Sequence, residues 1–274
     1  MKQEPLIFVL DLDGTIIGDC IYQLILHNID EIAKKNTHRT KFNKPLSDCY
    51  NTNSKLIRPY FKYFVNSIKK TYPGSLFYIY TASEKSWAQK EIGFIEKTHN
   101  FKFNRPLFTR DDCIIDSHGN YKKSVNKILP MIKKKHKSMM IQKSKILVID
   151  NNETFIDASN FIHCPTYDGI QFCDIWENMK KELLSIYELK NMIIQLIMSN
   201  KVCKYNSFFT NPLCDNSTEM KHKWYYKKYK KINKVNKKFK NDMFWKKLAN
   251  TIIEKKITSF DKQNIQLLKK HSCS

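Results

Sequence analysis

The chain has 274 residues, of which 42% are hydrophobic and 13% aromatic, so it can build a sizeable core as one large domain or as a domain with an extension. Its net charge is +22, but only four of its 48 basic residues are arginines. Such a lysine-rich composition is typical of an AT-rich coding bias, so charge alone does not indicate nucleic-acid binding. The eight cysteines form no C-x-x-C pair and no zinc spacing, and no apolar run has the length of a signal peptide or membrane span. These features predict a soluble intracellular protein, nuclear or cytoplasmic, without a membrane partner.

The first element is a short apolar run, residues 6–10, bounded by Pro5 and an acidic turn, which predicts a buried strand. Asp11 and Asp13 follow it one residue apart, so strand alternation places both side chains on one side of the chain. Two carboxylates at a strand end repel each other unless a cation or a proton lies between them. The pattern therefore favours a divalent metal with an anionic ligand, although similar letters also occur in solvated turns.

The next segment, residues 16–55, divides into two parts. Residues 20–32 have apolar spacing typical of a helix, whereas residues 34–54 are polar and predict a loop. Because this segment directly follows the acidic turn, it can be a small cap over an active site. A solvated insertion fits the sequence equally well.

A helix is predicted over residues 60–71, directly after Pro59, and a second apolar strand over residues 76–80. This strand also ends in a polar turn, at Thr81, and Ser83 is the expected N-cap of a helix over residues 84–98. A hydroxyl and free amides at the start of a helix are suited to phosphate binding. A simple helix cap is the alternative.

The middle of the chain predicts shorter elements and one lysine-rich helix. Residues 107–108 are a candidate third strand, Gly119 starts a turn, and residues 122–135 have helical spacing. Most lysines of that helix are expected to face solvent, and one of them is a candidate phosphate ligand. The spacing does not select which.

Two further strands are predicted at residues 146–149 and 161–162, followed by a long helix over residues 175–199. The first of these strands ends in Asp150 and Asn151. Strands that alternate with helices predict a parallel sheet with helices on both faces, in which ligands bind at the carboxyl ends of the strands. The polar residues that end three separate strands are therefore expected to meet at one site.

These motifs resemble those of the haloacid dehalogenase (HAD) superfamily, which has D-x-D-G-T and T after strands, a lysine, and D-N after a strand. Within it the chain is similar to the FCP/SCP-type, NLI-interacting-factor-like phosphatases, over roughly residues 6–190. The matching segments are residues 58–59 (RP), 78–83 (YIYTAS), 107–113 (LFTRDDC), 118–123 (HGNYKK) and 148–152 (VIDNN). Four ordered motifs in context are far more specific than one.

The resemblance implies a Mg²⁺-dependent phosphoric monoester hydrolase. Asp11 would be the nucleophile that forms an aspartyl-phosphate, and Asp13 would be the general acid and base. The groups expected to bind the phosphoryl oxygens or the substrate are Thr81, Ala82, Lys123 and Arg110.

The resemblance also implies a metal site and a substrate class. Mg²⁺ would bind Asp11, the carbonyl of Asp13 and Asn151, with Asp150 in support. The expected partner is a phosphoserine or phosphothreonine protein, such as an RNA polymerase II C-terminal-domain-like substrate. Gly14 departs from the family's usual D-L-D-E-T, and the 20–55 segment has no match to its substrate-recognition region. A nucleotide or polynucleotide phosphatase therefore stays open, as does a nucleic-acid-binding protein whose phosphatase site is secondary.

Residues 191–274 form a basic extension, with 19 lysines against five acidic residues. Aromatic residues are interleaved with the lysines, a pattern found both in nucleic-acid-binding or acidic-partner-binding segments and in helices that pack on a neighbouring domain. Apolar spacing from Phe244 to Ile253 favours packing. The predicted architecture is thus an α/β protein. It has a HAD-type, Rossmann-like parallel sheet flanked by helices in residues 1–190, a small cap after the first strand, and a mostly helical basic extension in residues 191–274.

Overall fold

The structure is a computed structural model that describes residues 4–18, 29–32, 34–35, 57–167, 187 and 241–272. The chain divides into two compact units. The first, here called the sheet unit, comprises Met1–Gly18, Ile57–Tyr167 and Asp242–Ser274. The second comprises Asp19–Leu56 and Asp168–Asn241, most of which lies outside the described residues.

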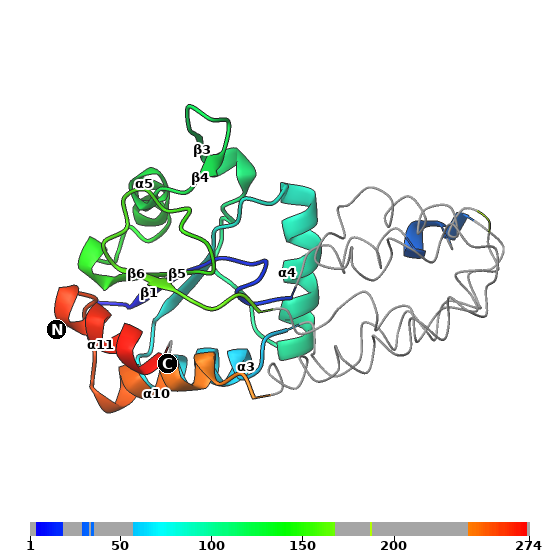
Figure 1. The fold of residues 1–274 in the computed structure, drawn as a ribbon. Coiled ribbons are helices and arrows are strands. Elements are labelled where there is room, and N and C mark those ends of the chain that lie inside the picture. Colours follow the sequence, from blue (N-terminus) through cyan, green and yellow to red (C-terminus); the bar gives the residue numbers. More distant parts are fainter. Residues whose placement is uncertain are drawn as a thin grey trace. The chain divides into compact units, whose positions relative to one another are not determined.

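The sheet unit is built on four parallel strands in the order β2-β1-β5-β6. The strands are β1 (Ile7–Leu10), β2 (Leu76–Ile79), β5 (Ile146–Asp150) and β6 (Phe161–His163). Every residue of β1 is buried because the strand lies in the middle of the sheet with a helical layer on each face (Figure 1). The predicted α/β fold with a parallel sheet is confirmed.

Helices and a small hairpin connect the strands. The helices are α3 (Phe61–Thr71), α4 (Lys85–His99) and α5 (Val125–Lys135), and the hairpin strands are β3 (Ile114–Ile115) and β4 (Tyr121–Lys122). Short 3₁₀ turns cover Arg110–Asp112 and Lys143–Lys145. The lysine-rich helix predicted from residue 122 thus begins three residues later, because residues 121–122 pair with β3 and Ser124 caps α5 through Lys127 N–H.

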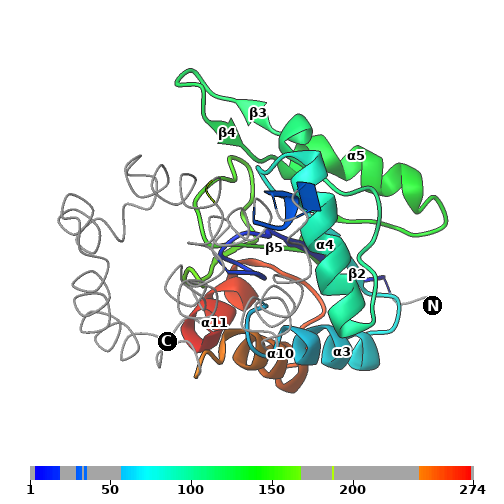
Figure 2. The same cartoon turned by 90° about the vertical axis from the view of Figure 1, so that its right-hand side faces the viewer.

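Strand alternation divides the core into two layers. Val9, Tyr78 and Val148 point to one face, where they pack in one cluster with α5 residues such as Ile128. Phe8 points to the other face, among the rings of other elements. Figure 2 shows α5 on one side of the sheet and α3, α10 and α11 on the other.

The second layer contains the end of the chain. Helix α10 (Phe244–Glu254) packs beside α3, and α11 (Lys262–Ser272) packs on α10 and β6. The fully buried Trp245 ring lies 5.1 Å from the Phe61 ring and 4.8 Å from the Phe64 ring, centroid to centroid. The packing predicted from the spacing of residues 244–253 is therefore confirmed.

The predicted division at residue 190 differs from the compact units of the structure. Residues 242–274 belong to the sheet unit, so this part of the basic extension completes the core. The aromatic and basic residues 224–239 and most of the predicted helix 175–199 lie outside the described residues. In the predicted cap, residues 29–32 and 34–35 are described and helical, so residues 34 and 35 are helical where a loop was expected.

The prediction of a third strand at residues 107–108 was wrong. Phe108 instead forms a single parallel bridge to Tyr80 beyond the end of β2. Its N–H donates to Ile79 O at 3.0 Å, and Thr81 N–H donates back to Phe108 O at 3.0 Å. These bonds fix the chain as it leaves β2.

Candidate active site

The acidic turn after β1 is a tight loop fixed by main-chain hydrogen bonds. The amides of Thr15, Ile16 and Ile17 all donate to Leu12 O, at 3.0 to 3.3 Å. Gly14 has φ +78°, and a Cβ added there would lie 2.6 Å from Asn151 Nδ2. Glycine is thus required both by the left-handed backbone and by the close approach of Asn151.

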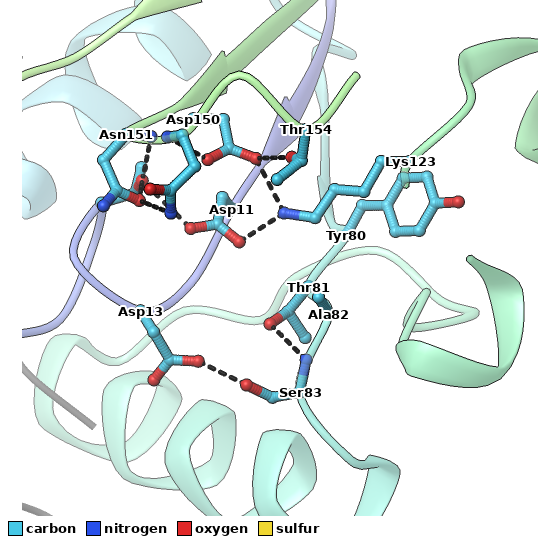
Figure 3. A network of polar contacts seen from close by, with 12 residues as sticks. Asp11, Asp13, Tyr80, Thr81, Ala82, Ser83, Lys123, Asp150, Asn151 and Thr154 are labelled. Atoms are coloured by element: carbon cyan, nitrogen blue, oxygen red, sulfur yellow. Dashed lines mark hydrogen bonds and ion pairs between the residues drawn. The ribbon is translucent and has the colours of Figure 1, made fainter. Parts of the chain in front are cut away.

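Asp11 lies in a buried charge cluster with Lys123 and Asp150. Lys123 Nζ lies 2.5 Å from Asp11 Oδ1 and 2.8 Å from Asp150 Oδ2, and all three side chains are at most 7% exposed. Asp150 also accepts hydrogen bonds from Asn152 N–H and Thr154 Oγ1–H, at 2.7 and 2.8 Å. Figure 3 shows Lys123 reaching Asp11 from one side and Asn151 on the other.

The cluster shifts the proton affinity of both partners. Burial raises the pKa of Asp11 to about 7, with Asp150 adding to the rise and Lys123 opposing it. Burial lowers the pKa of Lys123, but Asp11 and Asp150 outweigh burial and hold it above its ordinary value. Lys123 is therefore a permanent cation, and it keeps the neighbouring carboxylate ionisable.

The sequence predicted that Lys123 lies on a helix, and this prediction was wrong. It lies between β4 and α5, where it forms a bridge with Phe155. Its ammonium lies 5.6 Å from the centroid of the Phe155 ring and 6.0 Å from that of the Tyr80 ring. The faces of aromatic rings attract cations, so both rings favour the charged lysine. Asp157 holds the next two residues, since it accepts from Ser124 Oγ–H and Val125 N–H.

Asp13 lies in different surroundings. It is half-buried, and Ser83 Oγ–H donates to its Oδ2 at 2.6 Å (Figure 3). The prediction that Ser83 caps the following helix was wrong: Glu84 occupies the N-cap position of α4, and the Ser83 hydroxyl faces the acidic turn instead. Glu91 of α4 is also near, because burial and then the charge of Asp13 raise its pKa to about 8.

Thr81 and Ala82 form a small loop after β2. Thr81 is buried, and its Oγ1 accepts from Ser83 N–H at 3.1 Å, so the hydroxyl proton can be donated to a ligand. Within the described part of the chain, the Ala82 N–H has no acceptor. These two donors suit a phosphoryl group beside Asp11.

Arg110 supports that loop. Its Nε–H donates to Ala82 O at 2.9 Å, its Nη1 lies 3.0 Å from Glu84 Oε1, and its guanidinium lies 5.0 Å from the Tyr121 ring. The predicted substrate contact therefore lies at the rim of the site. In this structure the side chain is bound to the loop that carries the Thr81 hydroxyl and the Ala82 N–H.

Oxygen atoms that suit a hard cation meet beside Asp11. One end of the Asn151 side-chain amide lies 3.2 Å from Asp11 Oδ2 and 3.0 Å from the main-chain O of Asp13. With nitrogen at that end the amide donates to both atoms, and with oxygen at that end three oxygens converge, as Mg²⁺ prefers. Among the described residues there is no cluster of three or more His, Cys, Asp or Glu that could hold a metal.

Sequence reasoning brought together most of this site but missed several members. Thr15 Oγ1 accepts from Asn151 N–H at 3.0 Å and lies 3.2 Å from Asp11 Oδ2, which links two of the converging segments. Thr154 and Glu91 carried no motif signal. Thr15 did, because it is the last residue of D-x-D-G-T.

The architecture and the site together define a class. A parallel α/β sheet whose carboxyl edge carries two aspartates, a buried lysine and a threonine hydroxyl has the arrangement that the HAD-like motifs of the sequence predict for a phosphoryl-transfer site. The family model for NLI interacting factor-like phosphatases matches residues 6–202. The chain belongs to this family of phosphatases, and the family predicted from the sequence motifs is confirmed.

Other comparisons are more distant. Nine solved chains match, two of them structures of Fcp1. One is a variant of the fission yeast RNA polymerase II CTD phosphatase Fcp1 bound to beryllium fluoride, with 17% identity and a TM-score of 0.39, covering 76% of this chain and 56% of that one. The other is Fcp1, an essential RNA polymerase II CTD phosphatase, with 16% identity and a TM-score of 0.39, covering 91% of this chain and 66% of that one. The chain thus spans about 56% to 66% of the length of these structures.

A search among curated proteins found no significant match. In the described part of the chain, no helix combines the length and the apolar character that a membrane crossing requires.

Proposed function

We propose that the chain hydrolyses phosphate monoesters through a covalent phosphate on Asp11. The observation that carries this proposal is the position of Asp11, which lies between a buried cation, Lys123, and the side-chain amide of Asn151. A carboxylate placed in this way is oriented and shielded from water, and the Lys123 ammonium favours its ionised form, as a nucleophile requires.

In the first step an Asp11 carboxylate oxygen attacks phosphorus, and the bond from phosphorus to the substrate oxygen breaks. Asp13 gives a proton to the leaving oxygen. The hydroxyl of Thr81, the N–H of Ala82 and the ammonium of Lys123 offset the charge on the phosphoryl oxygens. In the second step Asp13 takes a proton from water, whose oxygen attacks phosphorus and releases Asp11.

We further propose that the site uses Mg²⁺. Asp11, the carbonyl of Asp13 and the amide oxygen of Asn151 would hold it, while Asp150 supports the set through Lys123 and Asn152. Bound there, the metal would offset charge on the phosphoryl group and on Asp11. Removal of the metal with a chelator should abolish turnover, and added Mg²⁺ should restore it.

The substrate we propose is a phosphoserine or phosphothreonine protein. The proposal rests on the phosphatase family and on the name of its CTD-phosphatase relative Fcp1. A panel that compares phosphoserine and phosphothreonine peptides with nucleotides and 5′-phosphorylated DNA tests it. Preference for nucleotides or DNA ends would overturn the protein substrate but leave the phosphatase chemistry intact.

Asp11→Asn is the test of the chemistry. The amide retains the shape of the carboxylate but is no nucleophile, so turnover of an aryl phosphate with Mg²⁺ should fall to background. The matched control is Asp116→Asn, a half-buried aspartate in the β3–β4 turn, which should leave turnover unchanged. Undiminished turnover by a folded Asp11→Asn variant would refute the proposed function.

A further inference from the structure

The Arg58 side chain makes a buried contact that the proposed chemistry does not use. It is 1% exposed, and its Nε and Nη2 lie 3.0 and 2.9 Å from Asp242 Oδ2. Its Nη1–H donates to Pro165 O at 2.8 Å, and its guanidinium lies 4.7 Å from the Phe244 ring. A fully buried guanidinium is costly unless its donors are satisfied, so this set of partners is specific.

These partners are the points where the chain enters and leaves the sheet unit. The chain leaves after Gly18, returns at Ile57, leaves again after Tyr167 and returns at Asp242. Arg58 lies in the segment where the chain first returns. It bonds to Asp242, where the chain returns a second time, and to Pro165, just before the chain leaves a second time. Asp242 in turn accepts from Phe244 N–H at 3.0 Å and so fixes the start of α10.

The same segments hold the acidic turn. The Arg58 N–H donates to Ile16 O at 2.8 Å, and the Tyr167 N–H donates to Gly14 O at 2.8 Å. Thr166 Oγ1 lies 3.2 Å from the outer end of the Asn151 amide. A continuous path of hydrogen bonds therefore runs from Asp242 through Arg58 and residues 165–167 to the backbone between Asp13 and Thr15.

We propose that Arg58 is a positioning residue for the acidic turn, and that Asp242 makes the C-terminal helices part of the catalytic apparatus. The guanidinium holds residues 165–167 in the place where Tyr167 and Thr166 fix Gly14 and Asn151. The kinetic part of this inference rests on the proposed phosphatase function. The alternative is that the pair only stabilises the core.

The test replaces the pair by apolar residues of similar size, in the double variant Arg58→Met/Asp242→Leu. Such replacements often keep stability because no buried charge remains unpaired. If Arg58 positions the turn, kcat for an aryl phosphate falls by about 10- to 100-fold, since small displacements of reacting groups have effects of this size. KM changes by less than about threefold because Thr81 and Ala82 lie on other segments.

Hydrogen exchange gives a second measurement that needs no turnover. The amide of Tyr167, bonded to Gly14 O, should lose protection in the double variant. The amide of Leu76, bonded to Leu6 O at 2.9 Å in the sheet, should keep it. If wild type shows no phosphatase activity, the proposed function fails, and this measurement alone decides the role of Arg58.

The matched control is Arg105→Met/Glu96→Leu. This second arginine–carboxylate pair lies 3.0 Å apart, and Arg105 also donates to a main-chain carbonyl, that of Phe103, at 2.9 Å. Within the described residues this pair has no bond to the acidic turn, so kcat and Tyr167 protection should stay at the wild-type level. If the double variant of Arg58 and Asp242 does not fold, Arg58→Lys is measured in the same way, because lysine retains the charge but has no planar fork to bind Asp242 and Pro165 O together. Wild-type kcat and Tyr167 protection in the folded variant would overturn the proposal.

Discussion

Asp11 and Asp13 are one residue apart, yet the structure gives them opposite surroundings. Asp11 is buried against the Lys123 ammonium, which is shared with Asp150. Asp13 is half-buried, and it accepts a hydrogen bond from Ser83 near Glu91, whose own pKa is raised. The two carboxyl groups can therefore have different roles. The fixed cation beside Asp11 favours the ionised form that a nucleophile needs, whereas the protonated neighbours of Asp13 suit a general acid and base.

After the loss of the nucleophile, the largest expected effect comes from removing the proton donor. Asp13→Asn should lower kcat for a phosphoserine peptide by about 10²- to 10⁴-fold, the usual contribution of a general acid. The loss should be smaller for nitrophenyl phosphate, whose leaving group needs less protonation. Steady-state kinetics with both substrates measure the difference, and an equal loss with both would contradict the role assigned to Asp13.

The second test removes the cation that distinguishes Asp11. In Lys123→Met, Asp11 and Asp150 remain as buried carboxylates without a counter-charge, so the free energy of unfolding should fall by about 3–5 kcal/mol. Chemical denaturation measures this loss. The control is Lys127→Met on α5, where an exposed lysine donates to Cys113 O and contacts no carboxylate in the described residues. Equal stability loss in both variants would show that the charge cluster has no special role.

The third test addresses Glu91 beside Asp13. Because its pKa is raised from 4.5 to about 8, the folded chain holds this proton while the unfolded chain releases it. The proton on Glu91 therefore contributes fully to the free energy of unfolding below about pH 4.5. This contribution falls by about 1.4 kcal/mol for each pH unit as the pH rises toward 8. Glu91→Gln should remove this loss, and melting curves across the range measure it. Glu153→Gln, on an exposed glutamate, should retain the wild-type slope.

The smallest effect is expected at Gly14, directly after the second aspartate. Gly14→Ala places a side chain on a left-handed residue, which costs about 1–2 kcal/mol, and brings a Cβ within 2.6 Å of Asn151. Gly74→Ala is the matched control, since Gly74 has φ +87° but nothing within 4 Å of an added Cβ. Any activity lost in Gly14→Ala beyond the effect in Gly74→Ala reports the displacement of Asn151. Equal effects would show that Asn151 adjusts freely.

Much of the fold follows from local patterns. The apolar runs predict β1, β2 and β5 within a residue of their observed bounds, because buried parallel strands need continuous apolar sequence. Asp11, Thr81 and Asp150 follow from these strands. In a parallel sheet the carboxyl ends share one edge, so residues far apart in sequence are brought together by topology alone.

Other features depend on packing that no local pattern contains. The spacing of lysines does not show that Lys123 precedes α5 and enters the site, since that depends on the bridge to Phe155 and the cap at Ser124. Ser83 could cap a helix or bond Asp13, and only the path of the chain after β2 decides between them.

The arginine of the RP motif illustrates the same limit over a longer distance. Arg58 pairs with Asp242, 184 residues away, and the sequence gives no sign of that partner. The sequence by itself determined the strands, the acidic turn and the family, because short-range spacing specifies strand ends. The tertiary structure alone decided which lysine, which hydroxyl and which C-terminal residues complete the site, because those contacts form only when distant segments pack around one core.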